Sequence, residues 1–111
     1  MESYEFGRIR IDGKTYTSDL IIFPDYVEDN WWRKEGHSLH REDIGAIMEE
    51  APEILIVGTG SSGYLNVSRE IKKYIESKGI KVKIAKSREA CKLFNELSEK
   101  RRVVAAFHLT C

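Results

Sequence analysis

A continuous apolar run at residues 54–57 leads directly into a glycine-rich segment, residues 58–63, with the spacing Gly-x-Gly-x-x-Gly. Four successive apolar residues predict a strand covered on both faces, which is typical of a parallel sheet. Beyond the glycines, apolar residues recur at helical spacing from Val67 to Ile75, and Gly79 stands where such a helix ends. The chain must therefore pack a helix against a sheet soon after this strand.

The remainder of the chain continues this alternation of strand and helix. We predict a strand at residues 80–85, a helix that Ser87 caps and a closing strand at residues 103–109. Right-handed crossovers make these strands parallel to the first one. A further helix, starting near Ser38 or His40 and ending before Pro52, precedes them.

The N-terminal quarter has a different pattern. Residues 4–11 and 14–17 flank Asp12-Gly13, a pair that favours a tight hairpin turn, and residues 20–23 form a third short strand. A polar, aromatic loop at residues 25–36 follows. The fold class is therefore α/β: a single three-layer domain over residues 1–111, with a mixed central sheet, a β-α-β-α-β C-terminal part and an N-terminal antiparallel β-meander.

Charge and composition restrict the class of partner. Eighteen basic residues balance eighteen acidic ones, so no overall field gathers nucleic acid. The N-terminus has no apolar signal segment and the chain has no apolar run of membrane-spanning length, so we expect a cytoplasmic protein without a membrane partner. Nothing indicates secretion, which predicts reduced thiols at Cys91 and Cys111.

The glycine loop departs from a dinucleotide-binding motif in two ways. That motif needs its third glycine at the start of the helix, whereas here the helical pattern begins at Val67, with Asn66 or Ser68 as its cap. It also needs an acid at the tip of the next strand, where this chain has Lys86 and Arg88. Three interpretations of this loop stay open: a tight structural turn, a site for a small anion or polar ligand, and a dinucleotide site.

Residues 31–37 concentrate two indoles, cations and an imidazole in the predicted loop. Alternating burial would place one of Trp31 and Trp32 in the core and the other near the surface. A sharper interpretation is a recognition surface, because Trp and Arg dominate binding hot spots and Arg33 can stack on an indole.

Two further arrangements depend on contacts that spacing alone does not establish. His37, His40, His108 and Cys111 are acceptable ligand types for zinc, but they form only two separate pairs. Cys111 with His37 or His108 would make a nucleophile only if thiol and imidazole touch. We assign no catalytic residue, no metal ligand and no cofactor.

Several short motifs together resemble a known family. They are Phe23-Pro24-Asp25, Trp32-Arg33, Gly36-His37, Gly58-Thr59-Gly60, Ala90, Asn95 and the segment Phe107-His108-Leu109-Thr110-Cys111. From about Gly7 to Cys111 the chain resembles the small single-domain family that includes adipogenesis-associated domain proteins and, more distantly, mitochondrial complex I assembly factor three. The resemblance implies a compact α/β fold with a mixed sheet, no demonstrated enzyme activity and a role in protein interaction. The chain lacks a targeting extension, so a mitochondrial role does not carry over.

We interpret the chain as a non-catalytic, cytoplasmic interaction or assembly module with an unidentified protein partner. The alternative is a protein that binds a small molecule or anion, or a weak enzyme, using the groove at the glycine loop. The residues that we expect at the site are Trp31, Trp32, Arg33, His37, Gly58, Thr59, Gly60, Ser61, Ser62, Gly63 and Arg88.

Overall fold

The computed structural model describes all of residues 1–111 and has two separate sheets. The larger sheet has five strands in the order β5-β4-β8-β6-β7. Its three mutually parallel strands are β6 (Ile54–Thr59), β7 (Lys81–Ala85) and β8 (Val103–His108). The strand β4 (Leu20–Ile22) pairs antiparallel with β8, and β5 (Val27–Asp29) pairs antiparallel with β4. The α/β class with a mixed central sheet is confirmed.

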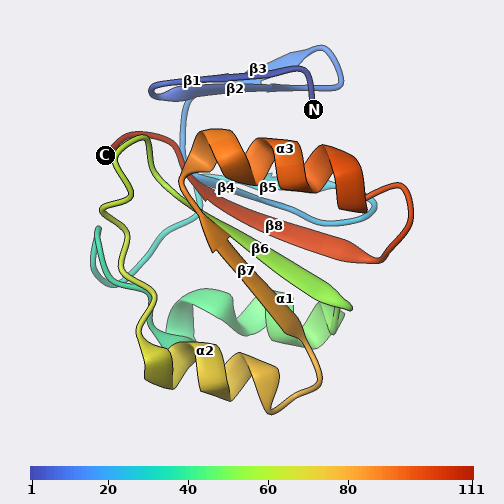
Figure 1. Cartoon of the computed structure of the whole chain (residues 1–111). Helices are drawn as coiled ribbons and strands as arrows, with labels where there is room; N and C mark the ends of the chain where they lie inside the picture. Colours follow the sequence, from blue (N-terminus) through green and yellow to red (C-terminus); the bar gives the residue numbers. More distant parts are fainter.

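Helices cover both faces of the five-stranded sheet (Figure 1). One face carries α2 (Arg69–Glu76) and α1 (Gly45–Glu50), which continues from a short 3-10 helix η1 (Arg41–Ile44). The other face carries α3 (Ser87–Leu97). The second sheet lies over the outer side of α3 and consists of β1 (Ser3–Glu5), β2 (Arg8–Ile11) and β3 (Lys14–Tyr16). The helix α3 is therefore enclosed between two sheets.

The alternation of side chains along β6 and β8 divides the core into two clusters. Leu55 and Val57 face α1 and α2, whereas Ile54 and Ile56 face α3 and the small sheet. All six residues of β6 and all six of β8 are buried, as the continuous apolar runs predict for strands covered on both faces. None of the helices is long and apolar enough to cross a membrane.

Four local predictions were wrong. Residues 4–11 do not form one strand, because Gly7 has a φ of 76° and turns the chain between β1 and β2. The strand at residues 20–23 joins the central sheet rather than the meander, and β5 occupies part of the predicted loop. Ser87 does not cap α3: its hydroxyl accepts from the amide of Gly60. Ser68 does cap α2, as one of the two predicted alternatives.

Candidate functional site

The candidate site lies where β6 and β8 end, because Thr59 and His108 are register partners and bring the following loops together. Ligands of open α/β sheets characteristically bind at this edge. Residues 31–38 join the same edge, since the amide of Asn66 donates to the carbonyl of His37 over 2.8 Å. Figure 1 shows these segments gathered with the C-terminus on one side of the molecule.

The amides of the glycine loop are directed at the chain itself. Ser61 donates to the carbonyl of Thr110 over 2.6 Å, and Ser62 and Tyr64 both donate to that of Cys111, over 3.1 and 3.0 Å. Gly63 donates to Gly60 over 3.3 Å. A dinucleotide fold aims such amides at a pyrophosphate. In this chain residues 110–111 take the position that a phosphate would need.

Two of the glycines are required by close packing. A Cβ atom on Gly60 would lie 2.4 Å from the carbonyl carbon of Cys111, and its φ of 104° disfavours any other residue. A Cβ atom on Gly58 would lie 2.5 Å from the ring of Phe107. Ser87 joins the glycine loop to the end of β8, because its hydroxyl donates to the carbonyl of His108 over 2.5 Å and accepts from the amide of Gly60 over 2.9 Å.

A charged cluster lies beneath the loops. One carboxylate oxygen of Asp19 contacts Nδ1 of His108 at 2.8 Å and Nη2 of Arg33 at 2.7 Å, and the other accepts from the amide of Leu109 at 2.8 Å. Burial alone would raise the pKa of Asp19. The hydrogen bonds from His108, Leu109 and Arg33 outweigh that effect and hold the pKa below its ordinary value.

Three nitrogen atoms of this cluster are buried without a hydrogen-bond partner: Nε and Nη1 of Arg33, and Nε2 of His108. The side chains of Arg33 and His108 are only 5% and 7% exposed. The guanidinium of Arg33 stacks on the ring of Trp31 at 4.7 Å, which offsets part of its lost hydration. Unpaired buried donors cost about 1 to 3 kcal/mol each, so the two free donors of Arg33 are groups that an acceptor would stabilise, whereas Nε2 of a neutral His108 that donates through Nδ1 is itself an acceptor.

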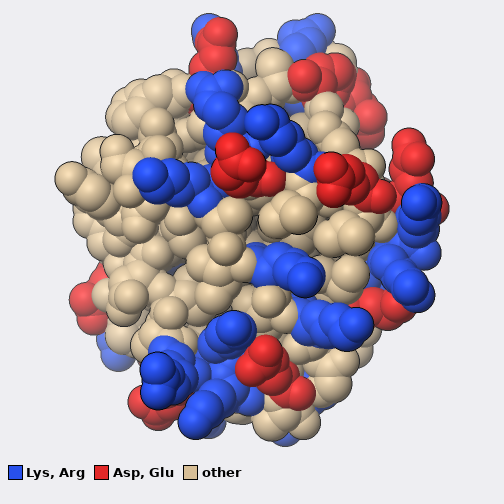
Figure 2. Space-filling view, viewed as in Figure 1, with Lys and Arg blue, Asp and Glu red and all other residues tan.

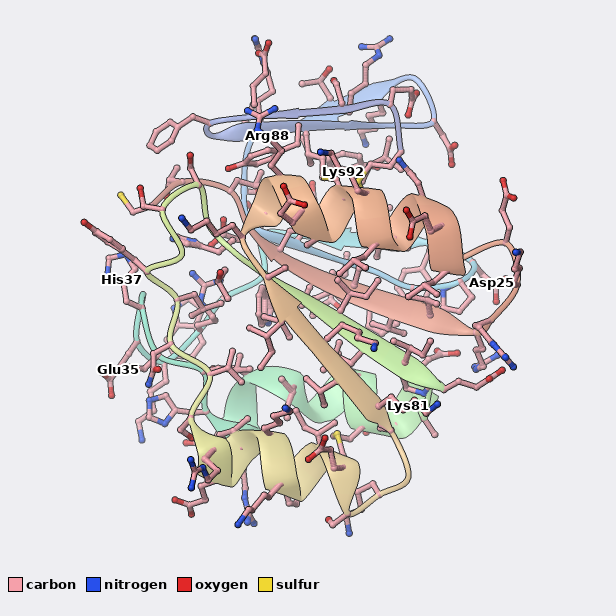
Figure 3. The ribbon with its side chains drawn as sticks, in the orientation of Figure 1. Asp25, Glu35, His37, Lys81, Arg88 and Lys92 are labelled. Atoms are coloured by element: carbon pink, nitrogen blue, oxygen red, sulfur yellow. The ribbon has the colours of Figure 1, made fainter.

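One of the two tryptophans is buried and the other is exposed, as alternating burial predicts. Trp31 is buried and its indole N–H donates to the carbonyl of Asp43 over 2.9 Å, whereas Trp32 is 74% exposed. Tyr64, in the glycine loop, is 61% exposed, and its ring meets His37 edge-on at 6.0 Å. His37 in turn meets His108 at 5.6 Å, and Figure 3 places it at the outside of this edge.

The structure brings most of the expected site residues to this edge, but in different roles. Trp32, His37, Ser61 and Ser62 are exposed, and Gly63 lies against Lys86. Thr59 is buried and donates to the carbonyl of Ala85 over 3.1 Å. Arg88 lies between α3 and the small sheet, with its guanidinium 5.7 Å from the ring of Tyr4 (Figure 3).

The histidine and cysteine arrangements take other partners. His40 contacts Glu35 at 3.0 Å, and no group of three or more His, Cys, Asp or Glu side chains is placed to hold a metal ion. Both cysteines are free, and no hydrogen bond joins Cys111 to His37 or His108. Burial raises the pKa of Cys91 to about 12, so this thiol stays protonated and unreactive.

The sequence model of the family described as a protein of unknown function (DUF498/DUF598) matches residues 1–108. The chain belongs to the DUF498 family. Its fold is that of a conserved hypothetical protein, PH1505 from Pyrococcus horikoshii OT3, with 33% identity, coverage of 99% of this chain and 98% of the other, and a TM-score of 0.87. A structure named MT938 is 28% identical, with a TM-score of 0.80 and coverage of 99% and 96%. A protein of Bartonella henselae described as an outer membrane protein is 25% identical, with a TM-score of 0.83 and coverage of 99% and 93%.

Sequence reasoning missed Asp19, the centre of the charged cluster in this DUF498 protein. Asp19 precedes β4, far along the chain from Arg33 and His108, and no motif marks it. Its only signal is a carboxylate at the start of an apolar strand, which is common at strand ends. Phe6, 63% exposed in the turn between β1 and β2, was also missed.

Proposed function

We propose that this DUF498 protein is a non-catalytic interaction module that docks a partner protein through an aromatic edge, defined as Phe6, Trp32 and Tyr64. One observation carries the proposal: these three large rings are mostly exposed, and the segments that bear them are tied to the end of β8 or to the residues that follow it, the Trp32 segment through the contact of Arg33 with His108 at 3.2 Å. Exposed aromatic side chains on a rigid support are the residues that dominate binding hot spots.

Each segment is held firmly, which keeps the entropic cost of docking low. The amide of Gly7, next to Phe6, donates to the carbonyl of Leu109 over 2.8 Å, and the amide of Tyr64 donates to Cys111. Trp32 is fixed by its neighbours, because Trp31 is buried and Arg33 is clamped by Asp19.

The chemistry of this surface favours an apolar, uncharged segment of the partner. Figure 2 shows few charged side chains over the part of the surface where Figure 1 places this edge, and many over the remainder. The resemblance to adipogenesis-associated domain proteins and to a complex I assembly factor supports a role in assembly. We place this role in the cytoplasm.

Photo-crosslinking tests the location of this surface. A photoreactive phenylalanine at position 32 or 64 should capture a defined partner in cells, whereas the same residue at position 26 should not. Tyr26 is a matched control because it is 54% exposed and lies at the other end of the sheet. With the captured partner purified, Trp32→Ala should weaken binding by about 2 kcal/mol or more, as expected of a hot spot. Equal capture at position 26, or unchanged binding by Trp32→Ala, would contradict the proposal.

A second candidate is the binding of a small anion beside the glycine loop, in a ligand-binding protein or weak enzyme. It is favoured by the two partnerless donor nitrogen atoms of Arg33. The engaged amides of residues 61–64 count against it. Titration with phosphate, acetate, ATP and NAD by calorimetry tests it, with Arg33→Lys as the variant that should lower any affinity found. Low-micromolar binding that Arg33→Lys abolishes would make this the leading function.

A further inference from the structure

The free side of β7 is a feature that neither proposed function uses. β7 is the last strand of the five-stranded sheet, so only one of its sides is paired. Figure 1 is viewed from the free side, and no other segment crosses in front of the strand. An uncovered edge strand is a template on which an extended segment of another protein can pair as a further strand.

Two residues of β7 direct their backbone groups toward the free side. The amide of Lys81 donates to the carbonyl of Glu53 over 3.0 Å, just before β6 begins, so residues 81, 83 and 85 bond toward β6. Because backbone groups alternate in direction along a strand, the amides and carbonyls of Val82 and Ile84 point outward. They offer an incoming strand two donors and two acceptors.

The side chains of β7 alternate between cationic and apolar. Lys81 and Lys83 are register partners of the β6 residues that face α3, and both lysines are exposed. Val82 and Ile84 lie on the other face of the sheet, where Val82 packs against the core and Ile84 stays 41% exposed. An added strand therefore meets lysines on one face and apolar side chains on the other.

The lysines of β7 are not neutralised within the chain. Neither Lys81 nor Lys83 takes part in an ion pair, and Glu53, which lines the same shallow pocket as Lys81, is paired with Arg101 at 3.7 Å. Residues 69–92 contain nine basic and three acidic residues, although the chain as a whole is balanced. In Figure 2, Lys and Arg side chains predominate over the part of the surface where Figure 1 places β7 and α2. This surface therefore attracts an acidic segment.

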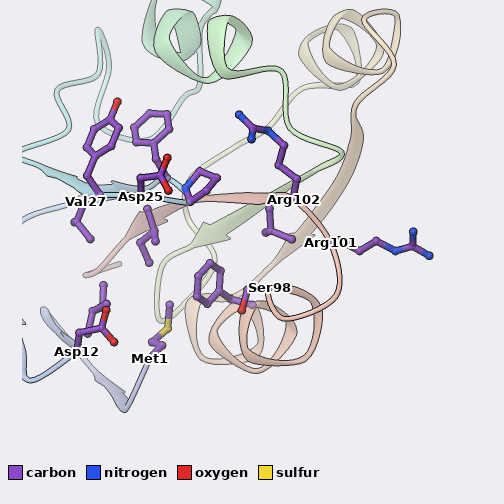
Figure 4. A pocket seen from close by; sticks show the side chains of 14 residues that line it. Met1, Asp12, Asp25, Val27, Ser98, Arg101 and Arg102 are labelled. Carbon is purple, nitrogen blue, oxygen red and sulfur yellow. The ribbon is translucent and has the colours of Figure 1, made fainter.

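The opposite edge of the sheet has the reverse charge. β5 carries Glu28 and Asp29, both exposed, and residues 19–53 contain ten acidic and three basic residues. Asp25, just before β5, borders a pocket of about 410 Å³ that Figure 4 shows from close by. The sheet thus has one acidic edge and one basic edge, so an acidic segment is attracted to β7 and repelled by β5.

We propose that the free side of β7 binds an extended segment of a partner protein in which acidic and apolar residues alternate. Paired antiparallel, this segment bonds to the backbone of Val82 and Ile84. Its acids lie opposite the lysines, at the non-hydrogen-bonded positions where side chains approach most closely. Lysines on an edge strand keep ordinary sheet edges away, so the same side chains select an acidic strand. The inference does not rest on the aromatic edge, because β7 makes all of these contacts.

Three short peptides of equal charge test this pairing by calorimetry. The first alternates, acetyl-Thr-Glu-Val-Glu-Val-Glu-Thr-amide; the second has its glutamates in succession, acetyl-Thr-Val-Glu-Glu-Glu-Val-Thr-amide; the third is the first with both valine amides N-methylated. The first should bind with a dissociation constant below about 1 mM, and the other two at least about tenfold more weakly. N-methylation removes the donors toward β7 but keeps the charge, so it separates strand pairing from attraction between charges.

Hydrogen exchange of single amides locates the bound peptide. The amides of Val82 and Ile84 should exchange more slowly when the first peptide is present. The amide of Lys81 is already bonded to Glu53, so its exchange should not change. Raising the salt concentration to about 0.5 M should weaken binding, because the lysines are exposed.

Substitutions test the charge selectivity. Lys81→Gln and Lys83→Gln should each weaken binding of the first peptide about threefold, and the double variant about tenfold, as expected of exposed charges. Lys14→Gln is the matched control and should change nothing, because Lys14 is an exposed lysine on β3, an edge strand of the small sheet. The thermal midpoint of each variant shows whether it is folded, and the three peptides on the unaltered protein need no substitution.

Any of three results would overturn the inference: no binding of the alternating peptide at about 2 mM, equally tight binding of either control peptide, or unchanged exchange at Val82 and Ile84. Two others would assign this surface to a different partner. A single-stranded oligonucleotide that binds more tightly than the peptide, and less tightly to Lys83→Gln, would make it a nucleic-acid site. Self-association that Lys83→Gln abolishes would make it the site for β5 of a second copy.

Discussion

The two ends of the five-stranded sheet differ in how their polar groups are used. At the carboxyl ends of β6 and β8, the loop amides, the hydroxyl of Ser87 and the carboxylate of Asp19 are all bonded within the chain. At the other end, the carboxylates of Asp12 and Asp25 are free of ion pairs, and they border a pocket of about 410 Å³. The end that carries the ligand-binding motif is thus filled by the chain itself, and the end without any motif is open.

This difference shows that the role of a glycine-rich loop depends on which group packs against its backbone and not on the spacing of its glycines. Gly60 has its φ of 104° and its close contact for the same reason that a nucleotide-binding glycine has them: something must come near the backbone. Here that neighbour is Cys111. Substitutions at the filled end should therefore cost stability, and matched substitutions at the open end should not.

The largest contrast is expected between two aspartates. Asp19→Asn should lower the free energy of unfolding by about 3 to 5 kcal/mol, because it leaves Arg33 buried without its counter-charge. Asp25→Asn should change it by about 0.5 kcal/mol or less, as for an exposed side chain without partners. Urea unfolding at pH 7 measures both, and similar losses would remove the contrast.

The next largest effect concerns Gly60. Gly60→Ala should cost about 3 kcal/mol, because the new methyl group would overlap the backbone of Cys111 and the residue would keep a positive φ. The control is Gly36→Ala, where nothing lies within 4 Å of the added atom and the cost should be about 0.5 kcal/mol or less. A stable Gly60→Ala protein would mean that residues 110–111 move away easily, which would reopen the anion-binding candidate.

A smaller loss is expected at Ser87. Ser87→Ala should cost about 2 kcal/mol, since it leaves the buried amide of Gly60 without an acceptor. Ser98→Ala at the open end is the control, with a change near zero. Hydrogen exchange of the Gly60 amide supplies a second readout, because it should speed up only in Ser87→Ala. Unchanged exchange would show that this bond does not close the loop.

The smallest effect is a change in pH dependence and not in stability at neutral pH. The folded-state pKa of Asp19 lies below its ordinary value of 3.8, so the stability it contributes is present above that pH and is lost as the pH falls through the folded-state value. Asp19→Asn should therefore lose less stability between pH 5 and pH 2 than the unaltered protein. The lowered pKa values of Glu2, Glu5 and Glu42 act in both proteins and cancel in this comparison. If the free energy of unfolding falls with pH equally in both proteins, the hydrogen bonds to Asp19 do not lower its pKa.

The sequence predicted those strands and helices whose apolar residues recur at one regular spacing. The buried runs of β6 and β8, the helix after the glycines and its possible cap at Ser68 all follow from local patterns. It also predicted the split between Trp31 and Trp32. These predictions succeeded because each depends on neighbours within a few residues.

The rest of the site depends on contacts between distant parts of the chain. Asp19 meets His108 across 89 positions, and no local pattern links them. Ser87 looked like a helix cap because it begins α3, but the approach of Gly60 and His108 gives its hydroxyl other partners. The pocket likewise arises from five elements, β2, β4, β5, α3 and β8, that have no shared motif. The roles of Trp32, His37 and Ser61 remain predictions.

The bond between Tyr4 and Leu109 bears on how the protein is made in the cell. The hydroxyl of Tyr4 donates to the carbonyl of Leu109 over 2.7 Å, across 105 positions of the chain. At a synthesis rate of about 5 to 20 residues per second, on the order of ten seconds separates the two residues. Throughout that interval the first hairpin has neither α3 nor the end of β8 to rest on, and its apolar residues Tyr4, Ile9 and Ile11 stay uncovered. The nascent chain is therefore a candidate for chaperone binding at its N-terminus until the last strand has left the ribosome.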